Sequence, residues 1–125
     1  MRLATKTQPT RLVTDDLLYH TMRGELSGVT DSLKAGANPN VSDGRHRITA
    51  LSFGAITGDE AIVTKLLDYG ADPSRVDRFG VLPLHRAVSG GFESVARKLI
   101  EVMARKAPAE DRPREHIVGV NMVLA

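Results

Sequence analysis

The sequence contains no cysteine and no tryptophan, and its large aromatic residues are three phenylalanines and two tyrosines. Without cysteine the chain cannot form a disulfide bond, a thiol nucleophile or a cysteine-ligated metal centre. Because aromatic side chains are so few, the hydrophobic core must be built from Leu, Ile, Val and Ala, which favours helices. The composition is compatible with a reducing compartment, and we expect a cytoplasmic protein.

A strong net charge and a long apolar run are also absent. The 17 Lys and Arg residues nearly balance the 15 Asp and Glu residues, and a net charge of +2 is far below that of a dedicated nucleic-acid-binding protein. Residues 1–13 carry only basic charges but lack the apolar run of a signal peptide. The longest apolar stretch, residues 117–125, is too short to span a bilayer. We therefore expect a basic N-terminal arm and no membrane role.

The 125 residues suit one compact domain, and within it a unit of 33 to 34 residues occurs three times. Residues 36–40 (Gly-Ala-Asn-Pro-Asn) recur as residues 70–74 (Gly-Ala-Asp-Pro-Ser), and residues 62–67 align with residues 95–100. Glycines also punctuate the three units at matching positions, which are Gly24, Gly58 and Gly91.

Each unit is expected to fold as two short helices and a turn. The pattern predicts helices over residues 50–57 and 60–69 in the second unit. In the third unit it predicts a first helix over residues 83–90 and a second helix that continues to about Lys106. Pro83 suits a first helical position, because the N–H it lacks would have no partner there. Such a helix pair cannot bury its own apolar face, so about three units must stack to form a stable array.

These residues resemble the ankyrin repeat family, whose pattern combines Thr-Pro-Leu-His at a helix start, a mid-repeat Gly and a closing Gly-Ala-Asp. The first unit matches at Leu17, Gly24, Val29, Leu33, Gly36, Ala37, Asn38, Pro39 and Asn40. The second matches at Asp43, Thr49, Leu51, Ala55, Gly58, Ile62, Val63, Leu66, Leu67, Gly70, Ala71, Asp72 and Pro73. The third matches at Asp77, Gly80, Pro83, Leu84, His85, Ala87, Gly91, Val95, Leu99 and Ile100. The resemblance implies an all-α solenoid of stacked helix-turn-helix units.

The repeat frame divides the chain into three parts. Residues 1–13 are expected to form the basic arm, and residues 107–125 a linker with a C-terminal capping helix. Between them lies an ankyrin repeat domain at residues 14–106, with repeats at about 14–42, 43–76 and 77–106. If the C-terminal segment is helical, one face would carry Ile117, Val120, Asn121 and Leu124, which suits a cap over the last repeat. The alternatives are a recognition helix or a homodimerisation segment.

The turns at the helix starts depart from the family pattern. The second unit has Ser52 in place of His, and the third has Leu82 in place of Thr. The resemblance implies that the Thr and the His form hydrogen bonds around this turn, so each turn keeps half of the arrangement, through Thr49 or His85. The loop leading into the second unit is one residue longer, and residues 43–47 (Asp-Gly-Arg-His-Arg) predict a protruding basic turn.

No arrangement in the sequence meets the requirements of a catalytic site, a metal site or a cofactor site. The sequence lacks the histidine spacing of a metal site, because no histidine lies within three to five residues of another; the four are His20, His46, His85 and His116. The pairs Asp15-Asp16 and Asp59-Glu60 are expected to cap helix N-termini, where carboxylates accept hydrogen bonds from free backbone N–H groups. Residues 90–91 (Gly-Gly) lack the rest of a phosphate-binding loop. We therefore expect no enzyme, no cofactor and no bound metal.

In the ankyrin family, partners dock on the loop tips and on the exposed side of the first helices. Carried over to this chain, the candidate partner-binding residues are Met22, Arg23, Arg45, His46, Ile48, Ile56, Thr57, Tyr69, Arg78, Phe79, Val81 and Ser89. Phe79 stands out because a phenylalanine at a turn tip leaves a large apolar face near solvent, and aromatic residues with Arg dominate interface hot spots. The alternative is that Phe79 folds back on Val81.

The leading functional hypothesis is a non-catalytic module that binds another protein, as an inhibitor or an adaptor. The alternative is nucleic-acid binding through the basic arm and the loop arginines, with salt-dependent affinity; the residues concerned are Arg2, Lys6, Arg11, Arg45, Arg47, Arg75 and Arg78. Nucleic acid is the less favoured partner because the net charge is close to zero.

Overall fold

A computed structural model describes residues 9–106 of the chain. Within this range the regular structure is helical, apart from one isolated antiparallel bridge between Ser42 and Thr49. Residues 1–8 of the expected arm lie outside the described residues, as do His116 and the expected linker and cap at 107–125.

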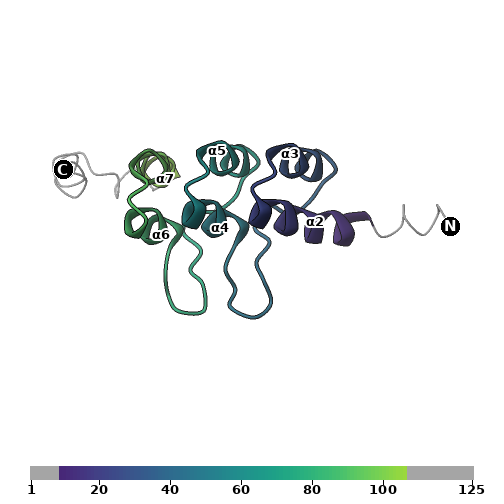
Figure 1. Ribbon diagram of the computed structural model, residues 1–125, viewed down its shortest axis with the longest axis horizontal. Coiled ribbons are helices and arrows are strands. Elements are labelled where there is room, and N and C mark those ends of the chain that lie inside the picture. Colours follow the sequence, from purple (N-terminus) through teal and green to yellow (C-terminus); the bar gives the residue numbers. More distant parts are fainter. Residues whose placement is uncertain (1–8, 107–125) are drawn as a thin grey trace.

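The described residues form three consecutive helix pairs (Figure 1). The first pair is α2 (Pro9–Arg23) and α3 (Leu26–Lys34), the second is α4 (Ala50–Thr57) and α5 (Glu60–Asp68), and the third is α6 (Pro83–Ser89) and α7 (Glu93–Lys106). Helices α2, α4 and α6 lie side by side in one row, and α3, α5 and α7 lie in a second row. The architecture confirms the expected all-α solenoid of helix-turn-helix units.

Two long loops extend from the row formed by α2, α4 and α6, on the side away from the other row (Figure 1). We call residues 38–49 finger 1 and residues 72–82 finger 2. Helices α2, α4 and α6, which lie beside the fingers, are the inner helices, and α3, α5 and α7 are the outer helices.

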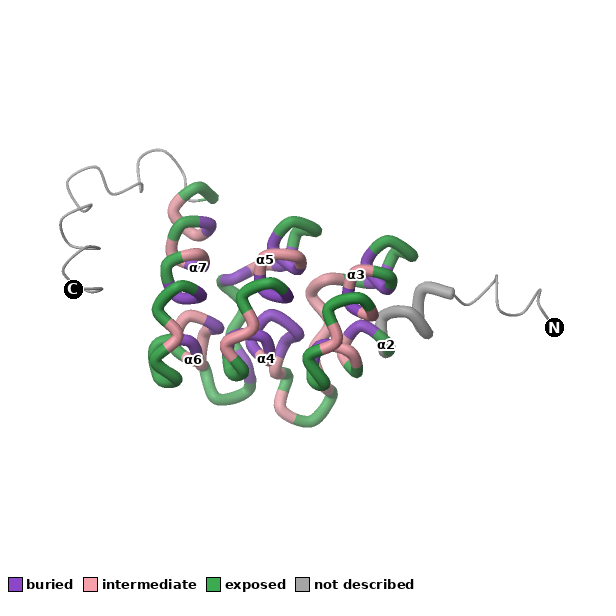
Figure 2. The backbone as a smooth tube through the Cα atoms, turned by 45° about the horizontal axis from the view of Figure 1, so that its top comes forward, coloured by how far each residue is buried: buried purple, intermediate pink, exposed green. Residues whose placement is uncertain are grey.

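The core runs continuously from the first pair to the third, between the two rows of helices. Its fully buried members include Leu17, Leu51, Ile62, Leu66 and Leu99, each at most 1% exposed. Figure 2 shows that the buried stretches of each pair face the neighbouring helices, whereas the exposed stretches lie on the outside of both rows. No helix pair has a closed core of its own, so each repeat depends on its neighbours for burial.

The helix ends follow the punctuation seen in the sequence. The Thr49 hydroxyl accepts a hydrogen bond from the Ser52 amide at the start of α4 (3.1 Å), and the Asp59 carboxylate accepts one from the Ile62 amide in α5 (3.2 Å). At the start of α6 the Leu82 amide donates to His85 Nδ1 (3.2 Å), so His85 has the hydrogen-bonding role expected of it. Gly58 closes α4 in the left-handed conformation, with a φ of 73°.

Ser52 shows the cost of one departure from the family pattern. It occupies the position where the family has His, and its side chain is buried in α4. Its Oγ atom has no hydrogen-bond partner among the described residues. A buried hydroxyl without a partner is unfavourable. Of the two side chains expected to form hydrogen bonds at this turn, only Thr49 does so.

The first repeat differs from the sequence expectation at its start. Helix α2 begins at Pro9, inside the range 1–13 assigned to an arm, and no glycine or further proline interrupts the chain before Arg23. The expectation that Asp15 and Asp16 cap a helix N-terminus is therefore wrong, because both lie inside α2. The error arose because the repeat pattern begins near Asp15, whereas the helix extends further back to a proline at its first position.

Candidate functional site

Asp43 shapes the tip of finger 1. Its Oδ1 atom accepts hydrogen bonds from the backbone amides of His46 (3.1 Å) and Ile48 (2.8 Å). The Asp43 amide in turn donates to the Ile48 carbonyl oxygen (3.0 Å), and Arg47 turns the chain with a φ of 57°. Residues 44–47 therefore form a closed, protruding turn that presents Arg45 and Arg47 to solvent.

Asp77 has the same role in finger 2 and is more deeply buried, since its side chain is 0% exposed. Its Oδ1 atom accepts hydrogen bonds from the amides of Phe79 (2.8 Å) and Val81 (3.1 Å), and its Oδ2 atom accepts one from Arg86 Nη2 (2.5 Å). Burial acts to raise the pKa of Asp77, but the hydrogen bonds from Arg86 and the two amides outweigh it, so the pKa is lower than usual. The ionised carboxylate anchors finger 2 to α6.

The two fingers contact each other at both ends. At the tips, the Arg78 amide donates to the His46 carbonyl oxygen (2.8 Å), and Arg78 Nη1 donates to the Arg45 carbonyl oxygen (3.1 Å). The Phe79 ring stacks on the His46 ring, with centroids 5.7 Å apart and planes inclined by 24°. At the base, the Asp72 amide donates to Asn40 Oδ1 (2.7 Å). These contacts hold the two tips together as one surface.

We call this surface the fingertip surface and define it as Arg45, His46, Arg47, Arg78 and Phe79. Phe79 is 63% exposed even though one face of its ring lies on His46. The sequence left open whether Phe79 folds back on Val81, and the structure instead places its ring against the neighbouring finger. The three arginines are also exposed.

The remaining candidate residues fall into three groups. Ile48 and Val81 are half-buried and brace the fingers through their amides, while Tyr69 is exposed at the C-terminal end of α5, beside the start of the loop to finger 2. The others lie on the inner helices: Met22, Arg23, Ile56, Thr57 and Ser89. Met22 and Ile56 occupy the same position in consecutive repeats and are both exposed, whereas the Thr57 hydroxyl donates to carbonyl groups of its own helix.

Tyr19 is an exposed residue of the inner helices that the sequence reasoning missed. It is 55% exposed on α2, and the Arg23 guanidinium lies 5.3 Å from the centre of its ring. Its place 34 residues before Phe53 is the sequence signal that could have revealed it, because aromatic residues then share one position of the first two repeats. Two further exposed apolar residues, Val76 in finger 2 and Val88 on α6, were not among the candidates either.

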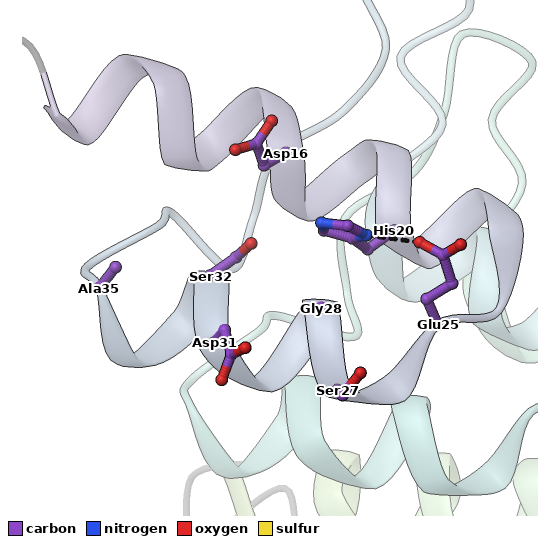
Figure 3. Close-up of a pocket in the computed structure, with 8 residues that line it drawn as sticks. All are labelled: Asp16, His20, Glu25, Ser27, Gly28, Asp31, Ser32 and Ala35. Carbon is purple, nitrogen blue, oxygen red and sulfur yellow. Dashed lines mark hydrogen bonds and ion pairs between the residues drawn. The ribbon is translucent and has the colours of Figure 1, made fainter. Parts of the chain in front are cut away.

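A cleft of about 670 Å³ lies between α2 and α3 (Figure 3). Within it, His20 Nδ1 lies 2.6 Å from one carboxylate oxygen of Glu25, and Arg23 Nε donates to the other (3.0 Å). The hydrogen bond with His20, followed by that from Arg23, lowers the pKa of Glu25. Through these two contacts, both carboxylate oxygens of Glu25 are engaged in holding the α2–α3 junction.

The described residues hold no group of three or more His, Cys, Asp or Glu side chains able to bind a metal ion.

No helix within residues 9–106 is both long enough and apolar enough to cross a membrane.

Three stacked helix pairs with paired loop tips define the described residues as a helical repeat array. Comparison with known families agrees, since the model for ankyrin repeats (many copies) matches residues 51–100. Over this stretch the chain is similar to proteins of the ankyrin repeat family. Ankyrin repeats are generally non-enzymatic modules for protein–protein interaction.

Three curated proteins illustrate the similarity. The chain is 31% identical over 99 residues to protein phosphatase 1 regulatory subunit 27 of Mus musculus, a match covering 78% of this chain and 64% of that protein. It is 35% identical over 85 residues to the Escherichia coli protein YahD, itself named as an ankyrin repeat protein, covering 62% of this chain and 41% of YahD. It is 39% identical over 72 residues to the palmitoyltransferase AKR1 of Candida albicans, covering 58% of this chain and 9% of that enzyme. The chain thus spans less than two thirds of each relative's length.

Proposed function

We propose that this chain is a non-catalytic module that binds a partner protein through the fingertip surface and the exposed side of the inner helices. The observation that carries the proposal is the joined pair of fingertips, in which Phe79 stacks on His46 and remains 63% exposed. Aromatic and Arg side chains dominate the binding energy of protein interfaces. A surface whose loops are already held in place also loses less conformational entropy on binding.

The inner helices extend this surface. Met22 and Ile56 are 53% and 40% exposed, and they repeat one position along the row of inner helices. Exposed apolar side chains at a repeated position supply the non-polar part of an interface whose polar part lies on the fingers. The partner is therefore expected to contact the fingers and the inner helices together.

We further propose that binding serves an adaptor or inhibitor role. The mouse relative is named as a regulatory subunit of a protein phosphatase, which supports a role in which binding alters the activity of a partner. The ankyrin repeat fold is a non-enzymatic interaction module, so the proposed effect on the partner is to occupy or relocate it.

The proposal can be tested by capture and crosslinking in lysate from the source cells. Wild type is compared with the variant Arg45→Glu/Phe79→Ala, and with a matched control, Leu26→Ala/Lys34→Glu, which makes the same kinds of change on outer helix α3. A photoreactive phenylalanine analogue is placed at position 79 in one protein and at position 26 in another.

We expect wild type and the α3 control to recover the same protein in similar amounts, while the fingertip variant recovers less than about a tenth as much. The analogue at position 79 should crosslink to that protein, and the analogue at position 26 should not. Equal recovery by all three proteins, or crosslinking only from position 26, would show that the fingertip surface is not the binding face. Circular dichroism of each variant verifies that its helices are intact.

A further inference from the structure

The arginines of the helices and fingers differ in whether they form an ion pair. Those that pair with a carboxylate within 4.0 Å lie on the helices and at the base of finger 2, and they are Arg23, Arg75, Arg86 and Arg97. Among the described residues, Arg45, Arg47 and Arg78 make no such ion pair. All three are exposed residues at the tips of the two fingers, and these tips contact each other through Arg78.

The carboxylates of the fingers do not neutralise this charge. Asp77 is fully buried and pairs with Arg86, so it contributes nothing to the exposed tip. Asp43 directs one oxygen to two backbone amides, and its other oxygen lies 3.6 Å from His46 Nδ1. Asp72 lies at the base of finger 2, where it pairs with Arg75. Near the tips, each finger therefore uses its acidic residue, Asp43 or Asp77, internally to form the turn and presents its arginines outward.

An exposed aromatic ring lies within the same charged surface. Phe79 follows Arg78 directly in the chain, and its ring stacks on His46, which lies between Arg45 and Arg47 in the sequence of the other finger. Guanidinium groups form strong, often bidentate hydrogen bonds with carboxylates, and an exposed phenylalanine ring gains from covering by another apolar side chain. The complementary ligand is a short anionic peptide that also carries an apolar group.

We propose that the fingertip surface binds an acidic segment of the partner protein, in which carboxylate side chains flank an apolar side chain that packs on Phe79. This inference rests on the proposed function and specifies the chemistry of the partner. The positive charge of this surface lies on the tips of two adjacent loops, so it matches a short peptide stretch. A nucleic-acid backbone, by contrast, requires a basic stripe that follows many phosphates.

A random peptide library displayed on phage tests this chemistry and does not require the partner to be identified. Peptides of about 12 residues are selected on the full chain, and the consensus peptide is synthesised with a fluorescent label for anisotropy measurements. Its affinity is measured for wild type, for Arg45→Gln/Arg47→Gln and for Phe79→Ala. The matched control is Lys34→Gln/Lys65→Gln, which removes the same charge from the outer helices. These substitutions spare the Arg78 side chain, which holds the two tips together.

We expect the selected peptides to be enriched in Asp and Glu around one Phe, Leu or Ile. Arg45→Gln/Arg47→Gln should weaken binding about tenfold, Phe79→Ala should weaken it several-fold, and the control should stay within about twofold of wild type. Raising the NaCl concentration should also weaken binding, because exposed charges are screened by salt.

Several results would overturn the inference. They are the absence of any enriched peptide, enrichment without acidic residues, and equal affinity of the Arg45→Gln/Arg47→Gln variant and the lysine control. Tighter fingertip-dependent binding of a single-stranded oligonucleotide than of the acidic peptide would assign the surface to nucleic acid instead. Crosslinking of a protein from position 79 combined with any of the first three results would leave the proposed function standing and remove only the acidic specificity. Crosslinking only from position 26 would remove the proposed function itself.

Discussion

Asp77 is the residue on which finger 2 depends most directly. Its buried carboxylate accepts hydrogen bonds from two backbone amides within the finger and from the Arg86 guanidinium of α6. Glycine and proline in the sequence indicate that a turn is present here, but they do not show that a single carboxylate holds both the turn and its attachment to a helix. The structural role of Asp77 therefore emerges only from the fold.

Replacing this carboxylate by an amide should destabilise the protein. We expect Asp77→Asn to lower the free energy of unfolding by about 2 kcal/mol, because the hydrogen bond to the charged Arg86 is lost while that guanidinium stays half-buried. Urea denaturation followed by circular dichroism measures the change. The control is Asp68→Asn at an exposed position on α5, which should change the value by less than about 0.5 kcal/mol. Equal effects of the two substitutions would contradict the assigned role.

The contribution of Asp77 to the free energy of unfolding should also depend on pH. Because the pKa of Asp77 is lower in the folded state than in the unfolded chain, its contribution is complete above the usual aspartate pKa near 4 and is lost as the pH falls through the folded-state value. The difference in unfolding free energy between wild type and Asp77→Asn should therefore shrink below about pH 4. Urea titrations from about pH 6 down to about pH 2.5 measure it, and a gap that widens on acidification would contradict the account.

Gly58 shows how a residue can be predicted in one respect and missed in another. The sequence predicts a helix over residues 50–57 followed by a punctuating glycine, and the structure places Gly58 there in the left-handed conformation. The sequence does not reveal that the Phe92 ring from the next repeat lies against Gly58, where an added Cβ would come within 2.4 Å of the ring. This contact depends on how the two repeats stack, which no local pattern encodes.

The two effects can be separated by comparing two glycines. Gly58→Ala and Gly70→Ala both place alanine at positive φ, but an added Cβ at Gly70 meets nothing within 4 Å. Backbone strain alone should cost about 1–2 kcal/mol at each position. We expect Gly58→Ala to be the more destabilising by at least about 1 kcal/mol, because Phe92 must move. Thermal and urea unfolding of both variants provide the comparison. Equal losses of unfolding free energy would mean that the contact with Phe92 does not contribute to the effect of Gly58→Ala.

At the scale of the elements, the fingers act as a pair. The sequence predicts both turns and the exposed positions of Arg45 and Phe79, because turn residues and their neighbours are local signals. It does not predict that Arg78 donates to His46 or that Phe79 stacks on His46, since these residues lie on loops of different repeats. The spacing between adjacent repeats sets these contacts, so they become visible only once the repeats are stacked.

A double-mutant cycle measures how strongly the fingers are coupled. His46→Ala, Phe79→Ala and the double variant are compared with wild type by urea denaturation. We expect an interaction energy of about 0.5–1.5 kcal/mol, the range typical of aromatic pairs. The pair of Phe79 and Tyr19, which lie on different elements, serves as a reference cycle and should be additive. Additive effects of His46→Ala and Phe79→Ala would show that the two tips move independently.

The helix boundaries show what sequence punctuation can and cannot deliver. Helix α4 spans the predicted residues 50–57, because a Thr cap and a glycine mark its ends, and α7 reaches Lys106, the last described residue. The start of α2 lies earlier than the repeat frame indicates, because the family pattern describes the repeated part of the helix and not its extension. An element at the edge of an array is therefore the least well predicted.

At the scale of the whole molecule, the three repeats share one core and should unfold together. Leu66 lies fully buried on α5, in the middle repeat, where it contributes to the core between its neighbours. We expect Leu66→Ala to lower the free energy of unfolding by about 2–5 kcal/mol and to destabilise all three repeats equally, as in a cooperative array. Leu26→Ala, at an exposed position on α3, is the size-matched control.

Hydrogen exchange of the Leu66→Ala variant resolves this cooperativity. The slowest-exchanging amides of α2, α4 and α6 should lose protection by the same free energy, because each helix pair buries its apolar side chains against the next pair. Loss of protection confined to α4 and α5 would mean that the repeats are energetically independent.

Hydrogen exchange of the complete chain, free and bound to the partner captured by the fingertip surface, tests the central claim most directly. Binding is predicted to slow exchange at the amides of residues 44–48 and 78–81 and along the exposed sides of α2 and α4, and to leave α3, α5 and α7 unchanged. If protection appears on the outer helices while both fingers exchange as freely as in the unbound protein, the assignment of the binding face is wrong.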